Sequence, residues 1–87
     1  MTTSQGGSFM FSERIRLLRG ERHLTQADVA QAVGLSTRGY QDLELGATPR
    51  GDTLLAIGEF YQVSLDWLMG RTDAREVARL TPKGGTP

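Results

Sequence analysis

The chain has 87 residues and zero formal net charge, because ten basic residues balance ten acidic ones. This length supports one small domain with a single modest core. With no cysteine and one histidine, the sequence offers no disulfide, no metal-ligand set and no assembled catalytic site. We therefore expect no cofactor, no metal and no enzymatic activity. The neutral total also argues against strong non-specific attraction to nucleic acid.

The two ends of the chain differ in composition from its middle. Small polar residues and glycines dominate the start, and prolines and glycines dominate the last seven residues. This composition predicts a flexible arm at residues 1–10, a folded domain at 11–70 and an extension at 71–87, with a weak helical segment at 73–80. No apolar run approaches the roughly 20 residues of a membrane helix, so we expect a cytoplasmic protein with no membrane partner.

Apolar residues recur at helical spacing in short segments, and no segment alternates as a strand would. The pattern predicts an all-α fold, a compact bundle of four to five short helices. The first helix is expected at residues 12–22, with Ser12 as its N-cap and His23 just beyond its end. Thr25 and Asp28 have the spacing of a capping box at the start of the second helix. Later helices are expected between residues 36 and 46, at 52–61 and at 65–69.

The second and third expected helices are joined by a turn of about three residues, an arrangement typical of a helix-turn-helix. Gly34 begins the turn and suits a left-handed conformation. Tyr40 and Leu43 fall on the inner face of the third helix, so its other face is left exposed. Because arginine pairs with guanine and glutamine with adenine in the major groove, that face suits base readout. Its polar residues are Thr37, Arg38, Gln41 and Asp42.

Several motifs occur in a distinctive order. They lie at residues 11–16, 24–30, 34–36, 43–46 and 63–68, and include LTQ-x-x-x-A and SLDWL. Together they resemble the Cro/C1-type helix-turn-helix family of prokaryotic and phage transcriptional regulators, which has the lambda-repressor-like DNA-binding fold. Residues 36–41 are also similar to prophage-type repressors.

The resemblance implies roles for individual residues. Gln26 would bond a DNA phosphate at the positive end of its helix, and Arg50 would contact the DNA backbone. Arg14 and Glu44 would form an ion pair between the first and third helices. Asp42 would either accept a hydrogen bond from cytosine or repel phosphate. The full expected DNA-binding set is Gln26, Ser36, Thr37, Arg38, Gln41, Asp42 and Arg50. Two further arginines, Arg16 and Arg19, are expected on a solvated face.

Regulators of this kind bind operators as two-fold dimers. The resemblance therefore implies a repressor that binds double-stranded DNA as a homodimer on an inverted repeat, associated with the nucleoid. An alternative is an antitoxin-like protein or an interaction module that uses the same helix-turn-helix to bind a protein, which the neutral charge favours. The expected dimer surface near the fifth helix comprises Phe60, Trp67, Leu68, Met69, Val77 and Leu80.

Overall fold

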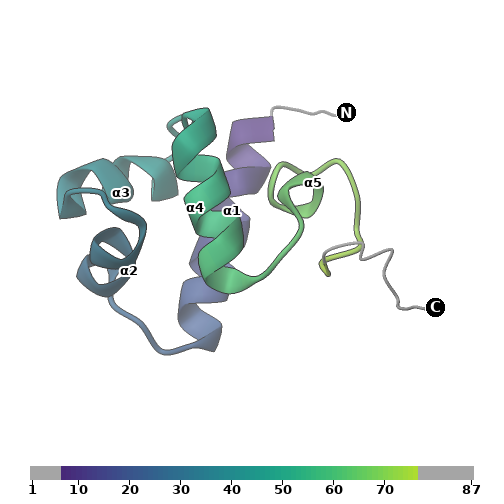
Figure 1. Ribbon diagram of the computed structural model, residues 1–87. Coiled ribbons are helices and arrows are strands. Elements are labelled where there is room, and N and C mark those ends of the chain that lie inside the picture. The colour runs from purple at the N-terminus through teal and green to yellow at the C-terminus, as the bar shows by residue number, and fades with distance from the viewer. Residues whose placement is uncertain (1–6, 77–87) are drawn as a thin grey trace.

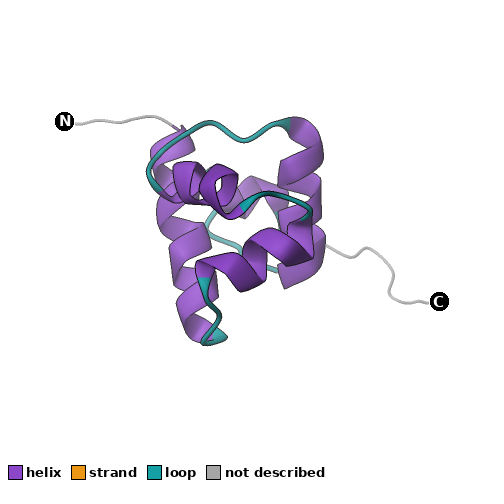
Figure 2. Cartoon of the chain, turned by 90° about the vertical axis from the view of Figure 1, so that its left-hand side faces the viewer, coloured by secondary structure: helices purple, strands orange, loops and turns teal. Residues whose placement is uncertain are grey.

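The computed structural model describes residues 7–76, which form helices and no strand (Figures 1 and 2). The all-α fold class is therefore confirmed. No helix in this described part is long and apolar enough to cross a membrane. The elements in chain order are α1 (Gly7–Glu21), α2 (Gln26–Val33), α3 (Thr37–Glu44), α4 (Gly51–Tyr61) and α5 (Leu65–Leu68).

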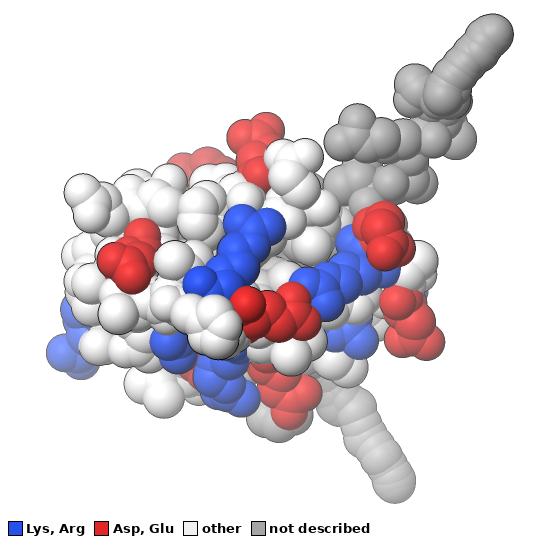
Figure 3. Space-filling model, turned by 90° about the horizontal axis from the view of Figure 1, so that it is seen from below, with Lys and Arg blue, Asp and Glu red and all other residues white. Residues whose placement is uncertain are grey.

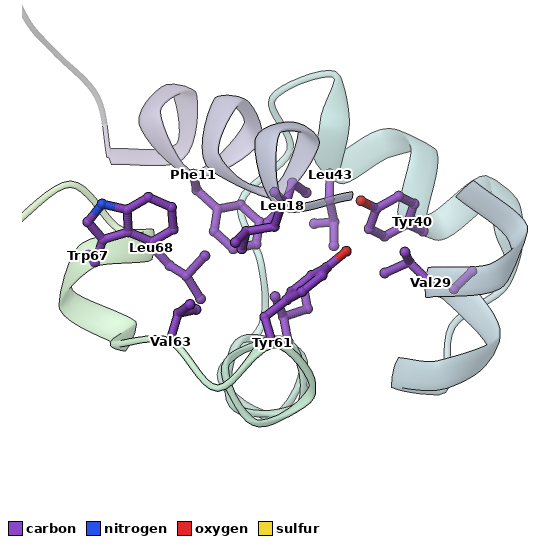
Figure 4. Close-up of a cluster of buried hydrophobic side chains, with 12 residues drawn as sticks. Phe11, Leu18, Val29, Tyr40, Leu43, Tyr61, Val63, Trp67 and Leu68 are labelled. Carbon is purple, nitrogen blue, oxygen red and sulfur yellow. The ribbon is translucent and has the colours of Figure 1, made fainter. Parts of the chain in front are cut away.

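The helices surround one apolar core. In Figure 1, α1 and α4 lie in the middle of the molecule, with α2 and α3 on one side and α5 on the other. Helix α3 packs against α1 and α2, and α4 packs against α2 and α5. Figure 4 shows the core side chains converging from these elements. The buried apolar residues are Phe11, Ile15, Leu18, Val29, Ala30, Tyr40, Leu43, Ile57, Tyr61, Val63, Trp67 and Leu68.

Helix α1 begins earlier than the sequence predicts. It starts at Gly7, so residues 7–10 of the expected arm are helical. Ser12 therefore lies inside the helix, where it is 2% exposed, and its assignment as an N-cap is wrong. Phe11, just before the predicted cap, is fully buried within α1, so the inward face of this helix begins upstream of Ser12.

The turn between α2 and α3 has the predicted chemistry. Thr25 caps α2 and forms a capping box with Asp28. Gly34 adopts the left-handed conformation with φ 80°, and its backbone N–H bonds back to the end of α2. Ser36 then caps α3 through its side chain. The helix-turn-helix is thus built from two capped eight-residue helices and a short turn, as expected.

Two non-glycine residues end helices in the left-handed conformation. His23 follows α1 with φ 57°, and Gln62 follows α4 with φ 58°. The sequence predicted a post-helical position for His23, and glycine is the residue that usually occupies such a site. Both residues therefore hold a strained backbone, which the neighbouring packed helices stabilise.

Residues 71–76 form no helix and lie against α1 and α5. Nη1 of Arg14 donates to the backbone oxygens of Trp67 at 2.6 Å and Thr72 at 3.2 Å. Arg75 accepts a backbone hydrogen bond from Ser64 at 2.9 Å. The guanidinium groups of Arg14 and Arg75 lie 4.6 and 5.2 Å from the centre of the Trp67 ring. A helix at 73–80 is therefore not present at residues 73–76, and residues 77–80 lie outside the described part.

Candidate nucleic-acid interface

The outer face of α3 carries the residues that the sequence predicts to read DNA. Tyr40 is fully buried and Leu43 is 6% exposed, so these two side chains hold the helix on the core. Thr37, Arg38 and Asp42 are exposed. The first turn of α3, Asp42 one turn further along and the half-buried Gln41 are therefore the parts of the helix that a partner can reach.

Ser36 has a structural role at the start of this helix. Its Oγ accepts a hydrogen bond from the backbone N–H of Gly39 at 3.0 Å. The cap uses an oxygen lone pair and leaves the hydroxyl proton out of this bond. An exposed hydroxyl at the positive end of a helix suits donation to a phosphate oxygen.

A buried carboxylate lies beneath this face. Glu44, the last residue of α3, is 3% exposed. Its Oε2 accepts hydrogen bonds from Nε of Arg19 at 2.6 Å and from the hydroxyl of Tyr40 at 2.5 Å. Its Oε1 accepts bonds from Nη2 of Arg19 at 3.1 Å and from Nε2 of Gln26 at 3.0 Å. The carboxylate thus joins α1, α2 and α3 at one point.

The surroundings of Glu44 keep it ionised. Burial alone would raise the pKa of its carboxyl, but the hydrogen bonds from Arg19, Tyr40 and Gln26, with the charge of Arg19, outweigh burial and lower the pKa. The hydrogen bond to Glu44 raises the pKa of Arg19. Burial, followed by the contact with Glu44, raises the pKa of the Tyr40 hydroxyl. Near neutral pH, Glu44 therefore accepts hydrogen bonds and its three partners donate them.

The ion pair that the sequence predicts between Arg14 and Glu44 is wrong, because Arg19 is the partner. Arg19 is also not on a solvated face, since its side chain is 24% exposed. Arg16 is exposed, yet its Nη1 donates to the backbone oxygen of Glu44 at 2.7 Å. Arg19 lies four residues after the buried Ile15, so helical spacing alone places it on the inner stripe of α1. That spacing was the available signal for its role.

Gln26 and Gln41 bond to each other, a contact that the sequence did not predict. Both are half-buried, and Nε2 of Gln41 donates to Oε1 of Gln26 at 3.0 Å. Gln26 is the first residue of α2, where backbone N–H groups at the helix start lack partners within the helix. The pair therefore joins a candidate phosphate site to the candidate reading helix.

The exposed arginines of the candidate interface each face an acid. Nε of Arg38 lies 3.4 Å from Oδ1 of Asp42, one turn along α3. Nε of Arg50 lies 3.8 Å from Oδ1 of Asp52 at the start of α4. Basic and acidic side chains also lie side by side on the face shown in Figure 3, which views the molecule from below Figure 1. Such exposed pairs are weak, so a phosphate or base can displace them at small cost.

Two of the residues expected at a dimer surface are buried. Trp67 is 6% exposed and Leu68 is fully buried, so neither can supply a surface patch in this structure. The reason is that α5 is a short helix that turns these side chains inward. Phe60 and Met69 are half-buried against the core. The other two expected residues, Val77 and Leu80, lie outside the described residues.

Residues 15–68 of the chain match a family model described as helix-turn-helix. Two similar curated proteins are uncharacterised HTH-type transcriptional regulators of Bacillus subtilis (strain 168), YqaE and YobD. YqaE is 38% identical over 69% of this chain and 53% of its own length, and YobD is 32% identical over 74% and 58%. The cryptic phage CTXphi transcriptional repressor RstR of Vibrio cholerae is 33% identical over 85% of this chain and 68% of its own.

No solved structure matches the chain. The chain spans between half and three fifths of the length of the two Bacillus relatives. The match with each of the three relatives covers more than two thirds of this chain, and the family model spans the helix-turn-helix.

Proposed function

Because this chain belongs to the Cro/C1-type helix-turn-helix family of transcriptional regulators, we propose that it represses transcription by binding an operator through α3. The observation that carries the proposal is the seating of α3. Tyr40 and Leu43 fix its inner face, and its capped N-terminal turn stays exposed. This is the arrangement that a helix needs to enter a major groove with its first residues against the bases.

The exposed side chains divide into two kinds of contact. Thr37, Arg38 and Asp42 lie where base edges would be read, with Arg38 suited to guanine and Asp42 to the cytosine amino group. Ser36 and Arg50 suit phosphate contacts that fix the register of the helix. Gln26 adds a phosphate donor at the start of α2, and Gln41 adds an amide on the inner edge of α3.

The charge distribution bears on how the protein would find its site. Arg38 and Arg50 each have an acid within 4 Å, so the net positive charge of this face is low. Counterion release then drives only weak non-specific binding, and specificity depends on a few contacts. Pairing of two chains on an inverted repeat would double those contacts. The relative named as a phage transcriptional repressor supports repression as the outcome. We propose that this repression takes place in the cytoplasm, with the protein on the nucleoid.

A second candidate function is a protein-interaction module, and the same neutralised arginines favour it. An α3 face with balanced charges also suits a protein partner, such as the toxin of an antitoxin-like system. Salt distinguishes the two functions. For DNA binding, the logarithm of the binding constant must fall with the logarithm of the salt concentration, with a slope of about −0.9 for each phosphate neutralised. A flat salt dependence, or no DNA bound at low salt, would favour the protein-interaction function.

Selection of bound DNA from a random pool tests the proposed function directly. We expect enrichment of an inverted repeat whose half-sites lie about one helical turn apart. Sedimentation of the protein with and without that DNA then reports whether two chains bind. Failure to enrich any sequence at low salt would reject operator binding and leave the protein-interaction function.

A further inference from the structure

A directed chain of hydrogen bonds connects the buried carboxylate to the reading helix. Nε2 of Gln26 donates to Oε1 of Glu44, and Oε1 of Gln26 accepts from Nε2 of Gln41, both at 3.0 Å. Gln26 is thus bonded at both ends of its amide. Gln41 is bonded at one end, and the other end of its amide faces away from Gln26.

The direction of this chain follows from the ionisation of Glu44. An ionised carboxylate only accepts hydrogen bonds, so Gln26 must turn its NH₂ group toward it. The carbonyl oxygen of Gln26 then faces Gln41, and an oxygen accepts but does not donate. Gln41 must therefore turn its own NH₂ group inward. Each amide orientation is fixed by the one before it, starting from the buried charge.

The consequence for Gln41 is a defined outward chemistry. One of its amide hydrogens is used by Gln26, so the outward edge offers the carbonyl oxygen and the remaining hydrogen. An acceptor beside a donor complements the N6 amino group and N7 of adenine. The reversed amide would point its NH₂ group outward and complement the two acceptors of guanine, O6 and N7.

We propose that Glu44 is a positioning residue for base recognition, which orients Gln41 through Gln26 so that Gln41 selects adenine over guanine. This role rests on the proposed operator binding. Glu44 touches no DNA in it and acts only through the two glutamines. The other partners of Glu44 stabilise the carboxylate, but they do not transmit the orientation.

The substitution Glu44→Gln gives the sharpest test because it should reverse the direction of the hydrogen bonds that run through Gln26 to Gln41. Oε2 receives the two shorter bonds, from Nε of Arg19 at 2.6 Å and the hydroxyl of Tyr40 at 2.5 Å, whereas Oε1 receives Nη2 of Arg19 at 3.1 Å and Nε2 of Gln26 at 3.0 Å. The oxygen of the new amide therefore belongs at Oε2, at the cost of the bond from Nη2 of Arg19. Its NH₂ group then replaces Oε1 and faces Gln26. Gln26 turns its oxygen toward this NH₂ group, and Gln41 follows by turning its NH₂ group outward. The preferred base at this operator position should change from adenine toward guanine.

The matched control is Tyr40→Phe, which removes one hydrogen bond from Glu44 but keeps the carboxylate and its bond to Gln26. DNA selection is performed with the wild type and both variants at a temperature at which circular dichroism shows each to be folded. We expect adenine over guanine by about tenfold or more at one position for the wild type and for Tyr40→Phe. For Glu44→Gln we expect that preference to be lost or inverted, while preferences at other positions persist.

An NMR measurement on the free wild-type protein tests the orientation without DNA. Couplings across hydrogen bonds should connect Nε2 of Gln41 to the side-chain carbonyl carbon of Gln26, and Nε2 of Gln26 to the carboxyl carbon of Glu44. Couplings that show Gln26 donating to Gln41 would overturn the proposal, even if Glu44→Gln does not fold. So would the absence of any such coupling in spectra that resolve the side-chain amide signals of both glutamines. The proposal would also be overturned if the folded Glu44→Gln variant bound all DNA sequences more weakly by the same factor and still preferred adenine at this position. If the wild type enriches no sequence, operator binding itself fails, whereas the NMR result still decides the amide orientation.

Discussion

Replacement by phenylalanine should affect stability differently at the two core tyrosines, Tyr40 and Tyr61. The hydroxyl of Tyr40 donates to the ionised Glu44 at 2.5 Å, and both side chains are buried. The hydroxyl of Tyr61 is buried with no hydrogen-bond partner among the described residues, and burial raises its pKa to about 12. Replacing each tyrosine by phenylalanine keeps the ring in the core and removes only the hydroxyl (Figure 4).

The expected magnitudes follow from what each hydroxyl loses. A hydrogen bond to a charged group contributes about 1.5–3 kcal/mol, and Glu44 keeps its bonds to Arg19 and Gln26, so Tyr40→Phe should cost about 2 kcal/mol of unfolding free energy. An unpaired buried hydroxyl costs about 1–3 kcal/mol, so Tyr61→Phe should change stability by nothing or raise it by about 1 kcal/mol. For a domain of this size, each kcal/mol moves the melting temperature by roughly 4–8 °C.

Urea unfolding measures the difference, with the fluorescence of the single tryptophan as one probe and circular dichroism as another. Equal m-values would show that the variants change stability and not the extent of unfolding. Equal losses for the two variants, or a larger loss for Tyr61→Phe, would refute the hydrogen-bond assignment around Glu44.

The same comparison has a pH dependence with a defined sign. The folded-state pKa of Glu44 is lowered, so its stabilising contribution is complete above the pKa of the unfolded chain and is lost as pH falls through the folded value. The cost of Tyr40→Phe should therefore shrink in acid, because a protonated Glu44 is a weaker acceptor. A cost that stays constant through the acid range would indicate that Tyr40 acts by packing alone.

Three further outcomes are expected. Arg19→Ala should destabilise the fold by about 3 kcal/mol or more in urea unfolding, because it leaves the Glu44 charge buried without its cation. Gln62→Gly should raise the melting temperature, corresponding to about 0.5–1 kcal/mol, because glycine adopts the left-handed conformation without strain. In quantitative binding assays, Arg38→Ala should weaken the binding free energy by about 1–3 kcal/mol and relax the preference at one base position. Gln26→Ala should instead weaken binding to all sequences alike. If Arg38→Ala weakened binding to specific and random DNA equally, base readout by Arg38 would be contradicted.

The sequence predicted the helix-turn-helix well because its signals are local. Thr25, Gly34 and Ser36 satisfy or end a helix through their own backbone and near neighbours, and each has the expected role in the structure. Tyr40 and Leu43 were placed correctly for the same reason, since helical spacing alone separates the inner face of α3 from the outer one.

The errors came from contacts between distant elements. Arg14 and Arg19 both lie on the inner side of α1, and which of them reaches Glu44 depends on how α1 crosses α3. The burial of Leu68 likewise depends on how the short α5 folds back on α1, which no local pattern encodes. The bond between Gln26 and Gln41 joins two helices, so residue type and spacing could nominate each glutamine but could not pair them.

The contacts of residues 71–76 bear on where the cooperative folding unit ends. Arg14 bonds the backbone of Thr72, and Arg75 forms an ion pair with Glu21 while lying near the Trp67 ring. A fragment that stops at residue 70, the boundary that family motifs suggest, would keep α1 to α5 and yet lose these attachments to α1. Such a fragment should unfold at lower urea than the intact chain, so binding constants measured on it would describe a less stable protein.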